Sequence, residues 1–298
     1  MRRSDVAELL LLAALWGGSF LLMRVASPVL GPVWLIEARV LLAGTALLPV
    51  LARLNLLQEL RRNAVPLLIV GCINSALPFV LLAFATLSLP AGFTSILNGT
   101  VPLFGTIVAA IWLKERLTPP RLVGFVLGFA GVVVLVGWQV TVVTPSFVTA
   151  VAAGLGAALM YAIAAPYIKR SCAGVPALVV TTGSQLGAAL VLLPALPFTL
   201  PQQSPTGSAI AAVVALALLS TTLAYILYFR LIQNIGATRA LTVAYLIPLF
   251  AMLWGAIALG EAITPAMILG CGLVLLGTAI ANGLVTIKRY TRATPTKK

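Results

Sequence analysis

Ten long apolar segments, separated by short polar or proline- and glycine-rich breaks, run through almost the whole chain. A helix needs about twenty mostly apolar residues to cross the hydrocarbon core of a membrane, and each segment is close to that length. The segments cover residues 6–24, 33–52, 64–84, 90–112, 121–139, 147–168, 176–194, 209–229, 238–258 and 265–286. The pattern predicts an all-α integral membrane protein with ten transmembrane helices, no soluble domain and a basic tail at 288–298.

One stretch of this pattern occurs twice, at a constant offset of 146 residues. Residues 102–131 and 248–277 share the letters PLF, an aligned L-x-E-x-x-T-P and two aligned glycines. The aligned pairs include Pro102/Pro248, Glu115/Glu261, Thr118/Thr264, Pro119/Pro265, Gly124/Gly270 and Gly131/Gly277. Apolar composition alone does not easily produce such matches. We therefore predict a duplication, with a first five-helix repeat at 1–145 and a second at 146–287.

The two copies differ in charge. Lys114, Arg116 and Arg121 of the first copy are replaced by uncharged residues in the second. Cytoplasmic loops of membrane proteins carry an excess of Lys and Arg. With the N-terminus inside, ten spans place every basic residue except Arg24 and Arg39 on the cytoplasmic side. The charges thus predict two inverted repeats with both termini cytoplasmic, which is the plan of many secondary transporters.

Composition supports this interpretation and excludes several others. The chain is 61% hydrophobic and 8% charged, whereas soluble domains carry about 25% charged residues. The net charge of +13 lies in short loops and at segment ends, so we expect no nucleic-acid partner. The chain has no His, and its cysteines Cys72, Cys172 and Cys271 are far apart, so we expect no metal, no cofactor and no enzymatic activity. The first apolar segment lacks a clear cleavage site and is interpreted as a true span.

Several short motifs point to one family. They are Ala13, Trp16, Gly17, Ser19 and Phe20 in the first span, Arg39 early in the second, and Pro102, Glu115, Thr118, Pro119 and Gly124 around the fourth and fifth. With the five-plus-five spans, they resemble the EamA type of the drug/metabolite transporter superfamily over nearly the whole chain. Within it, the chain is most similar to the YddG-type exporters of aromatic amino acids. The resemblance implies a transporter of the bacterial inner (plasma) membrane.

Polar, aromatic and proline residues inside the spans are the candidates for a transport pathway. Asn74 aligns with Ser220, and Pro102 with Pro248, so such positions recur in the third and eighth and in the fourth and ninth spans. In inverted-repeat carriers the substrate site lies near the midplane, where helices break. We predict a central pathway between these four spans and the first and sixth. Its candidate residues are Trp16, Ser19, Asn74, Phe79, Asn98, Pro102, Tyr161, Thr221, Tyr225, Tyr245 and Pro248. The alternative is that the polar residues tie helices together, the prolines are simple kinks, and the aromatic residues pack.

Two ionisable residues, Glu37 and Arg39, lie well inside a span. They are two positions apart on one helix, so they point to nearly opposite faces and should not pair. Arg39 is either the partner of a substrate carboxylate or a side chain that extends to the outer surface. Glu8 lies too close to the cytoplasmic end to bind a cation at mid-span, and Glu115 and Glu261 are expected to cap or hold the hairpin turns.

The function expected is carrier-type secondary transport by alternating access, exporting small organic solutes and most of all amino acids, aromatic ones included. Drugs or other metabolites are the alternative on the same fold. Phosphorylated solutes such as nucleotide sugars are less favoured, because Arg39 is the one cation at mid-depth. A membrane enzyme or a channel is a weaker alternative. The partners expected are the solute and the lipid bilayer, and a monomer is compatible with the sequence.

Overall fold

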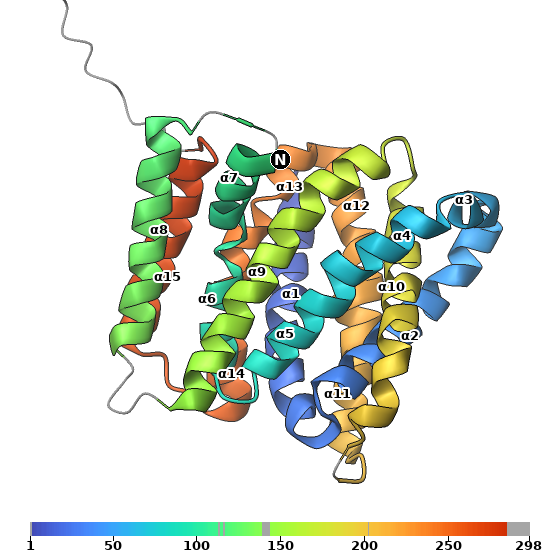
Figure 1. The fold of residues 1–298 in the computed structure, drawn as a ribbon, viewed down its shortest axis with the longest axis horizontal. Coiled ribbons are helices and arrows are strands. Elements are labelled where there is room, and N and C mark those ends of the chain that lie inside the picture. Colours follow the sequence, from blue (N-terminus) through green and yellow to red (C-terminus); the bar gives the residue numbers. More distant parts are fainter. Residues whose placement is uncertain (1, 113, 116, 139–143, 202, 285–298) are drawn as a thin grey trace, which may run out of the picture.

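The computed structural model describes residues 2–112, 114–115, 117–138, 144–201 and 203–284, and in this part the chain folds into helices joined by short connections (Figure 1). Eight helical segments are long and apolar enough to cross a membrane. Two further apolar helices, α14 (Val243–Leu259) and α15 (Pro265–Ala281), have 17 residues each. The molecule is a multi-pass membrane protein, and all ten predicted segments appear as helices. The predicted tail at 288–298 lies outside the described residues.

The first five segments are α1 (Arg3–Leu30); α2 (Pro32–Arg53); α3 (Leu57–Arg62), α4 (Ala64–Val70), the π-helix η1 (Gly71–Ala76) and α5 (Leu77–Ala85); α6 (Ala91–Asn98) with α7 (Val101–Trp112); and α8 (Pro119–Trp138). The other segments are α9 (Pro145–Ser171); α10 (Ala177–Leu192) with the 3₁₀ helix η2 (Leu193–Phe198); α11 (Gly207–Ala217), the π-helix η3 (Leu218–Leu223) and α12 (Ala224–Ile235); α13 (Ala237–Ala240) with α14; and α15.

The repeated Thr-Pro pair marks the beginning of a helix. Proline fits the first helical position because its missing N–H would have no partner there. At α15 the Thr264 hydroxyl accepts a hydrogen bond from the Met267 N–H at 3.2 Å, and α9 begins in the same way with Thr144 and Pro145. A Thr side chain that accepts from an unpaired N–H of the first turn caps the helix. Both repeated Thr-Pro pairs thus lie at the start of a helix, α8 and α15, and at α15 the Thr side chain caps it.

Helices of the first half pack mainly on helices of the second. The largest such contacts join α8 to α15, α1 to α14 and α2 to α10, and α9 lies against both α5 and α7. In Figure 1, α8 and α15 stand side by side at one end of the molecule, and α2, α3 and α4 lie toward the other end. Because the halves interleave, neither has a complete core of its own.

The contact between α8 and α15 depends on the repeated glycines. A Cβ added at Gly277 would lie 2.5 Å from the carbonyl oxygen of Gly124, and a Cβ at Gly131 would lie 2.8 Å from that of Gly270. Real Cβ atoms essentially never approach a backbone oxygen so closely. Small residues allow helix backbones to meet in a membrane, where van der Waals packing replaces the hydrophobic effect as a driving force.

Two spans contain a π-helical turn, and a third is interrupted. The π-helices η1 and η3 lie at matching places in the third and eighth spans. In η3, the hydroxyls of Thr221 and Thr222 donate to the carbonyls five residues earlier, at 2.9 and 3.0 Å. The fourth span stops at Asn98 and resumes at Val101, just before Pro102, whereas α14 runs through Pro248 without interruption. The ninth span is interrupted earlier, between α13 and α14.

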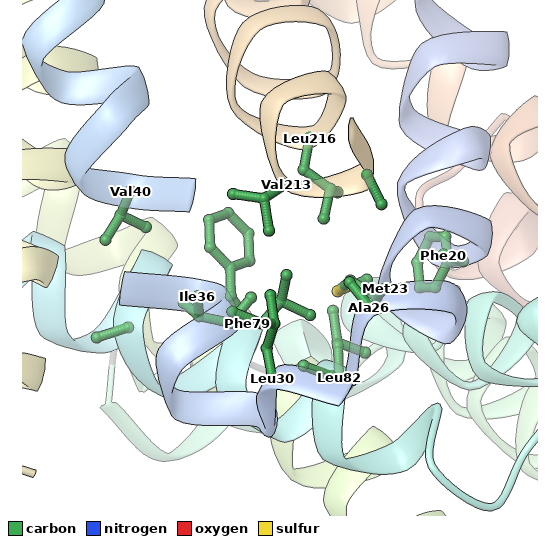
Figure 2. Close-up of a cluster of buried hydrophobic side chains, with 14 of the residues drawn as sticks. Phe20, Met23, Ala26, Leu30, Ile36, Val40, Phe79, Leu82, Val213 and Leu216 are labelled. Carbon is green, nitrogen blue, oxygen red and sulfur yellow. The ribbon is translucent and has the colours of Figure 1, made fainter. Parts of the chain in front are cut away.

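The largest hydrophobic cluster joins the two halves (Figure 2). Phe20 and Met23 of α1 and Ile36 of α2 meet Val213 and Leu216 of α11. These side chains are at most 8% exposed. Phe79 of α5 belongs to the same cluster, which places a core residue directly beside the site described below.

The glycine contact predicts a sharp effect of a single methyl group. We expect Gly277→Ala to destabilise the protein by about 1–3 kcal/mol, because the new Cβ overpacks the α8–α15 contact. Thermal unfolding in detergent should show a lower Tm. The matched control is Gly272→Ala on the same helix, where a Cβ would have no neighbour within 4 Å and alanine favours the helix. Equal Tm values for the two variants would contradict this account of the contact.

Candidate functional site

Arg39 is the centre of the candidate site. It lies on α2, two turns into the membrane-spanning helix, and its side chain is 4% exposed. Its Nε donates a hydrogen bond to the Thr221 hydroxyl of η3 at 3.1 Å, and its guanidinium carbon lies 3.9 Å from the centroid of the Phe79 ring. The structure thus turns Arg39 into the protein interior, and the alternative of a side chain that extends to the outer surface is wrong for this conformation.

The contacts of Arg39 satisfy its charge incompletely. No carboxylate among the described residues lies within ion-pair distance of it. One hydroxyl and one aromatic face are the protein partners that the structure gives it. A cation over an aromatic ring gains on the order of 2 kcal/mol when desolvated, whereas burying a charge costs far more. The site is therefore chemically suited to an anionic group that would complete the partners of Arg39.

Aromatic side chains surround this charge. The Tyr161 ring of α9 meets the Phe79 ring edge-on, with centroids 6.4 Å apart. Tyr161 and Tyr225 both lie near Arg39 in the protein interior. Trp16 of α1 extends the group, with its ring centroid 6.1 Å from that of Tyr225. Six of the residues predicted from the sequence, from five different spans, are thereby brought together: Trp16, Arg39, Phe79, Tyr161, Thr221 and Tyr225.

A second polar group lies at the break in the fourth span. The Thr278 hydroxyl of α15 donates to the Gly99 carbonyl at 3.4 Å, and the Asn282 amide donates to the Tyr245 hydroxyl at 3.2 Å. The Oδ1 atom of Asn98 is buried without a hydrogen-bond partner in the described structure. Both hydrogen bonds start from the C-terminal end of α15, which links the end of α6 and the start of α14 at this second polar group.

The remaining candidates take different roles. Ser19 donates to the carbonyl of Trp16 on its own helix, which is a local contact. Asn74 lies half-buried in η1. Pro102 follows the break between α6 and α7, and Pro248 is buried inside α14.

The sequence analysis did not identify Gln185, which forms a hydrogen bond with the π-helix η1. Gln185 of α10 donates from Nε2 to the Ser75 hydroxyl at 3.2 Å, and its Oε1 is buried without a partner in the described structure. The available signal was a lone amide in the middle of an apolar segment, since lipid makes such groups costly unless they have a partner or a use. Thr278 and Asn282 were missed because nothing in the sequence places the end of α15 beside α6 and α14.

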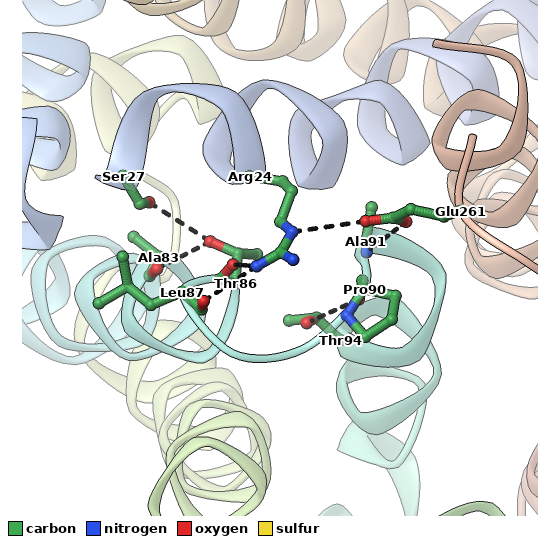
Figure 3. Close-up of polar contacts among 9 residues, drawn as sticks. All are labelled: Arg24, Ser27, Ala83, Thr86, Leu87, Pro90, Ala91, Thr94 and Glu261. Carbon is green, nitrogen blue, oxygen red and sulfur yellow. Dashed lines mark hydrogen bonds and ion pairs between the residues drawn. The ribbon is translucent and has the colours of Figure 1, made fainter. Parts of the chain in front are cut away.

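The predicted hairpin residues have clear partners. The Glu115 carboxylate binds Arg121 at 2.8 Å, which holds the α7–α8 connection as expected. Glu261 instead reaches another hairpin: its Oε2 accepts from the Ala91 N–H at 2.9 Å, at the start of α6, and its Oε1 lies 3.4 Å from Arg24 Nε (Figure 3). Arg24 also donates to the Leu87 carbonyl at 3.0 Å. Glu261 thus caps a helix, although not that of its own turn, and joins α1, α6 and the α14–α15 connection.

Comparison with known proteins identifies the family. The EamA-like transporter family matches the chain twice, at residues 6–137 and 148–283. The chain belongs to the EamA-like transporter family. Like other members of this family it is a transporter and not an enzyme, and the family's domain is present twice in the chain.

Named relatives of this EamA protein are transporters. An uncharacterized transporter of Archaeoglobus fulgidus is 25% identical over 91% of this chain and 96% of its own. A protein of Streptantibioticus cattleyicolor named "Probable terminal-alkyne amino-acid exporter" is 24% identical over 98% of both chains. An S-adenosylmethionine/S-adenosylhomocysteine transporter of Chlamydia muridarum is 24% identical over 89% of this chain and 87% of its own. A crystal structure of another protein, 25% identical, covers 95% of this chain and 99% of its own with a TM-score of 0.66.

The incomplete contacts of Arg39 predict that it serves transport and not stability. Replacing a buried charge by an apolar side chain is often neutral or stabilising by about 1–4 kcal/mol. We expect Arg39→Leu to keep or raise the Tm of the purified EamA protein while solute flux falls at least about tenfold. The control is Arg53→Leu at the end of the same helix, which should leave the flux unchanged. A large drop in Tm, with flux that follows the folded fraction, would assign Arg39 a structural role instead.

Proposed function

We propose that this EamA protein is a secondary, carrier-type transporter that exports small organic solutes, above all amino acids with aromatic side chains. The observation that carries the proposal is the buried Arg39, which has an aromatic face beside it and no carboxylate partner in the described chain. The carboxylate of an amino acid would bind the guanidinium, since Arg offers donors in a fork that matches a carboxylate. The rings of Tyr161, Tyr225 and Trp16 would contact the side chain of the solute.

Alternating access between two inverted halves is the proposed mechanism. The glycines that align between the halves support it: Gly124 aligns with Gly270, and Gly131 aligns with Gly277. In the structure the contacts are crossed, because Gly124 meets Gly277 and Gly131 meets Gly270. Such an exchange of partners is what a pseudo-two-fold axis requires. The contacts between helices follow the same rule: α5 packs on α9 as its counterpart α12 packs on α1, and α7 packs on α9 as its counterpart α14 packs on α1.

The two ends of the molecule differ in a way that suits alternating access. At one end, Arg24 and Glu261 hold α1, α6 and the α14–α15 connection together. At the offset of 146, their counterparts are Arg170 and Glu115. Glu115 binds Arg121 instead, and Arg170 has no hydrogen bond or ion pair with any described residue. Rocking of the halves would exchange these two arrangements, opening one end while it closes the other.

The proposed setting is the inner (plasma) membrane of a bacterial cell, with both termini in the cytoplasm. The distribution of Lys and Arg supports this orientation. The end closed by Arg24 and Glu261 would then face outward, so that the conformation seen here opens toward the cytoplasm, from which an exporter takes its solute.

A second candidate is export of other metabolites through the same site. One relative is named an S-adenosylmethionine/S-adenosylhomocysteine transporter. Such solutes combine an amino-acid carboxylate with an aromatic base, which the same arginine and rings would accept. Phosphorylated solutes fit less well, because Arg39 has no second cation beside it in the described structure.

The transport experiment uses the full-length protein in proteoliposomes. We expect the uptake of labelled phenylalanine to saturate as its concentration rises. Unlabelled phenylalanine inside the vesicles should accelerate this uptake, because a carrier with bound solute changes conformation faster than an empty carrier. Excess tryptophan should compete more strongly than threonine. S-adenosylmethionine as the stronger competitor would favour the second candidate, and flux that does not saturate would indicate a channel.

Reporter fusions test the inversion. A reporter in the 113–120 connection should be active in the cytoplasm, and one in the 259–264 connection should be active outside, because the basic residues of the first connection are absent from the second. Tyr290, in the predicted tail, provides a control fusion site that should report the cytoplasm. Reporters for both connections on the same side of the membrane would refute the inverted arrangement.

A further inference from the structure

Gln185 of α10 occupies the position in the second half that Arg39 occupies in the first. The two positions are 146 residues apart, which is the offset between the aligned motifs. Their hydroxyl partners, Ser75 and Thr221, are separated by the same 146 residues. Gln185 Nε2 donates to Ser75 of η1 at 3.2 Å, and Arg39 Nε donates to Thr221 of η3 at 3.1 Å. The same contact between a long polar side chain and a π-helical hydroxyl therefore occurs once in each half.

The two halves differ in the chemistry of this side chain. Arg39 is a cation that offers donors only, whereas the amide of Gln185 is neutral and includes an acceptor, Oε1. Gln185 is fully buried, and its Oε1 has no hydrogen-bond partner in the described structure. A buried acceptor without a donor is unfavourable, and the hydrocarbon of a membrane supplies none. The Oε1 atom is thus suited to a ligand that brings its own N–H group.

Gln185 and Arg39 contact neighbouring residues of the third span. Gln185 binds Ser75, and the Arg39 guanidinium carbon lies 3.9 Å from the centroid of the Phe79 ring. Ser75 and Phe79 are four positions apart and both buried, and side chains at this spacing lie on one face of a helix, with Cβ atoms about 5–6 Å apart. The helices that carry Gln185 and Arg39, α10 and α2, also pack directly on each other. The amide and the guanidinium are therefore about one helical turn apart along the third span.

An α-amino acid has a matching pair of groups. Its carboxylate and its ammonium are attached to one carbon atom, so the residues that bind them must be neighbours. The carboxylate fits the guanidinium fork of Arg39, and the ammonium offers several N–H donors to Oε1 of Gln185. Glu37 does not fit this role, because residues two positions apart on a helix do not face each other, and it lies two positions from Arg39 on α2.

We propose that Gln185 binds the ammonium group of the solute, so that the site recognises the zwitterionic head of an α-amino acid. This inference rests on the proposed export of amino acids and gives the second half its own part in binding. Ser75 holds the amide through Nε2, and Oε1 accepts from the ammonium. A neutral acceptor suits this position, because a carboxylate there would form a charge-assisted pair with Arg39 and compete with the solute. One bound solute then connects the two halves.

The experiment compares two ligands that differ only in the amino group. Titration calorimetry of the full-length protein in detergent measures the Kd of L-phenylalanine and of 3-phenylpropionate, which keeps the ring and the carboxylate. We expect the wild type to bind phenylalanine at least about tenfold more tightly, because a buried hydrogen bond to a charged group contributes that much. Gln185→Met has a similar shape and only a weak acceptor. It should weaken phenylalanine binding by this factor and leave the Kd of 3-phenylpropionate unchanged.

Loss of the preference for phenylalanine distinguishes this role from a structural one. If Gln185 only held α10 against η1, Gln185→Met would weaken both ligands equally, and that result would overturn the proposal. Gln185→Asn keeps a buried amide but is one methylene shorter, so it should remain folded and lose the preference too. The matched control is Ser184→Ala. It removes a neighbouring buried hydroxyl that donates to the Thr181 carbonyl of its own helix, and it should bind both ligands like the wild type.

The outcomes separate the ammonium site from the proposed function. A folded Gln185→Met or Gln185→Asn protein that keeps the full preference overturns the ammonium site, and the transport function stands. A wild type that binds both ligands equally has the same consequence. If the wild type binds neither ligand, the proposed export of aromatic amino acids fails, and the ammonium site fails with it.

Discussion

Inside a membrane, a peptide group can find a hydrogen-bond partner only within the protein, and this constraint determines the structure at every level. It explains why the described chain folds into helices and why each departure from regular α-helix has a local compensation. In η3, where the helix widens to a π turn, the hydroxyls of Thr221 and Thr222 bind the carbonyls of Leu216 and Ala217. At the end of α6, the Gly99 carbonyl accepts from Thr278. Irregular backbone is tolerated in a membrane protein where protein or a water-filled cavity surrounds it, which is why the irregular turns border the candidate site.

Because the chain is duplicated, both halves satisfy their backbone hydrogen bonds and pack their helices with the same structural features. The glycines of the two aligned pairs contact each other crosswise between α8 and α15, Gly124 with Gly277 and Gly131 with Gly270. The π-helices η1 and η3 occur at matching places. Each half supplies surfaces that the other needs, so the core of Figure 2 belongs to both halves. Two interleaved halves of similar shape are compatible with the two alternative packings that the proposed carrier mechanism requires.

The sequence predicted the helices and the membrane class because hydrophobic length and turn residues are local properties. It also predicted most members of the Arg39 group, since polar and aromatic residues at mid-span are costly and few. It could not predict that Arg39 meets Thr221, because that contact joins residues 182 positions apart and depends on the packing of α2 against η3. For the same reason the partner of Glu261 was missed: a capping role was foreseen, but the capped helix is α6 and the counter-ion is Arg24. Pro248 shows a further limit, since proline signals a break and α14 nevertheless continues through it.

The distribution of charge separates stability from function. Four of the six acids are paired with cations near helix ends or connections, where such pairs hold the fold together. Two ionisable groups that are buried inside a span, Glu37 and Arg39, have no ion-pair partner among the described residues, and they lie two residues apart on α2. A fold selected for stability alone would replace both by apolar residues, because each costs free energy in the packed state. The presence of Arg39 on the helix that contacts both halves is understandable if α2 must bind and release a solute as it moves.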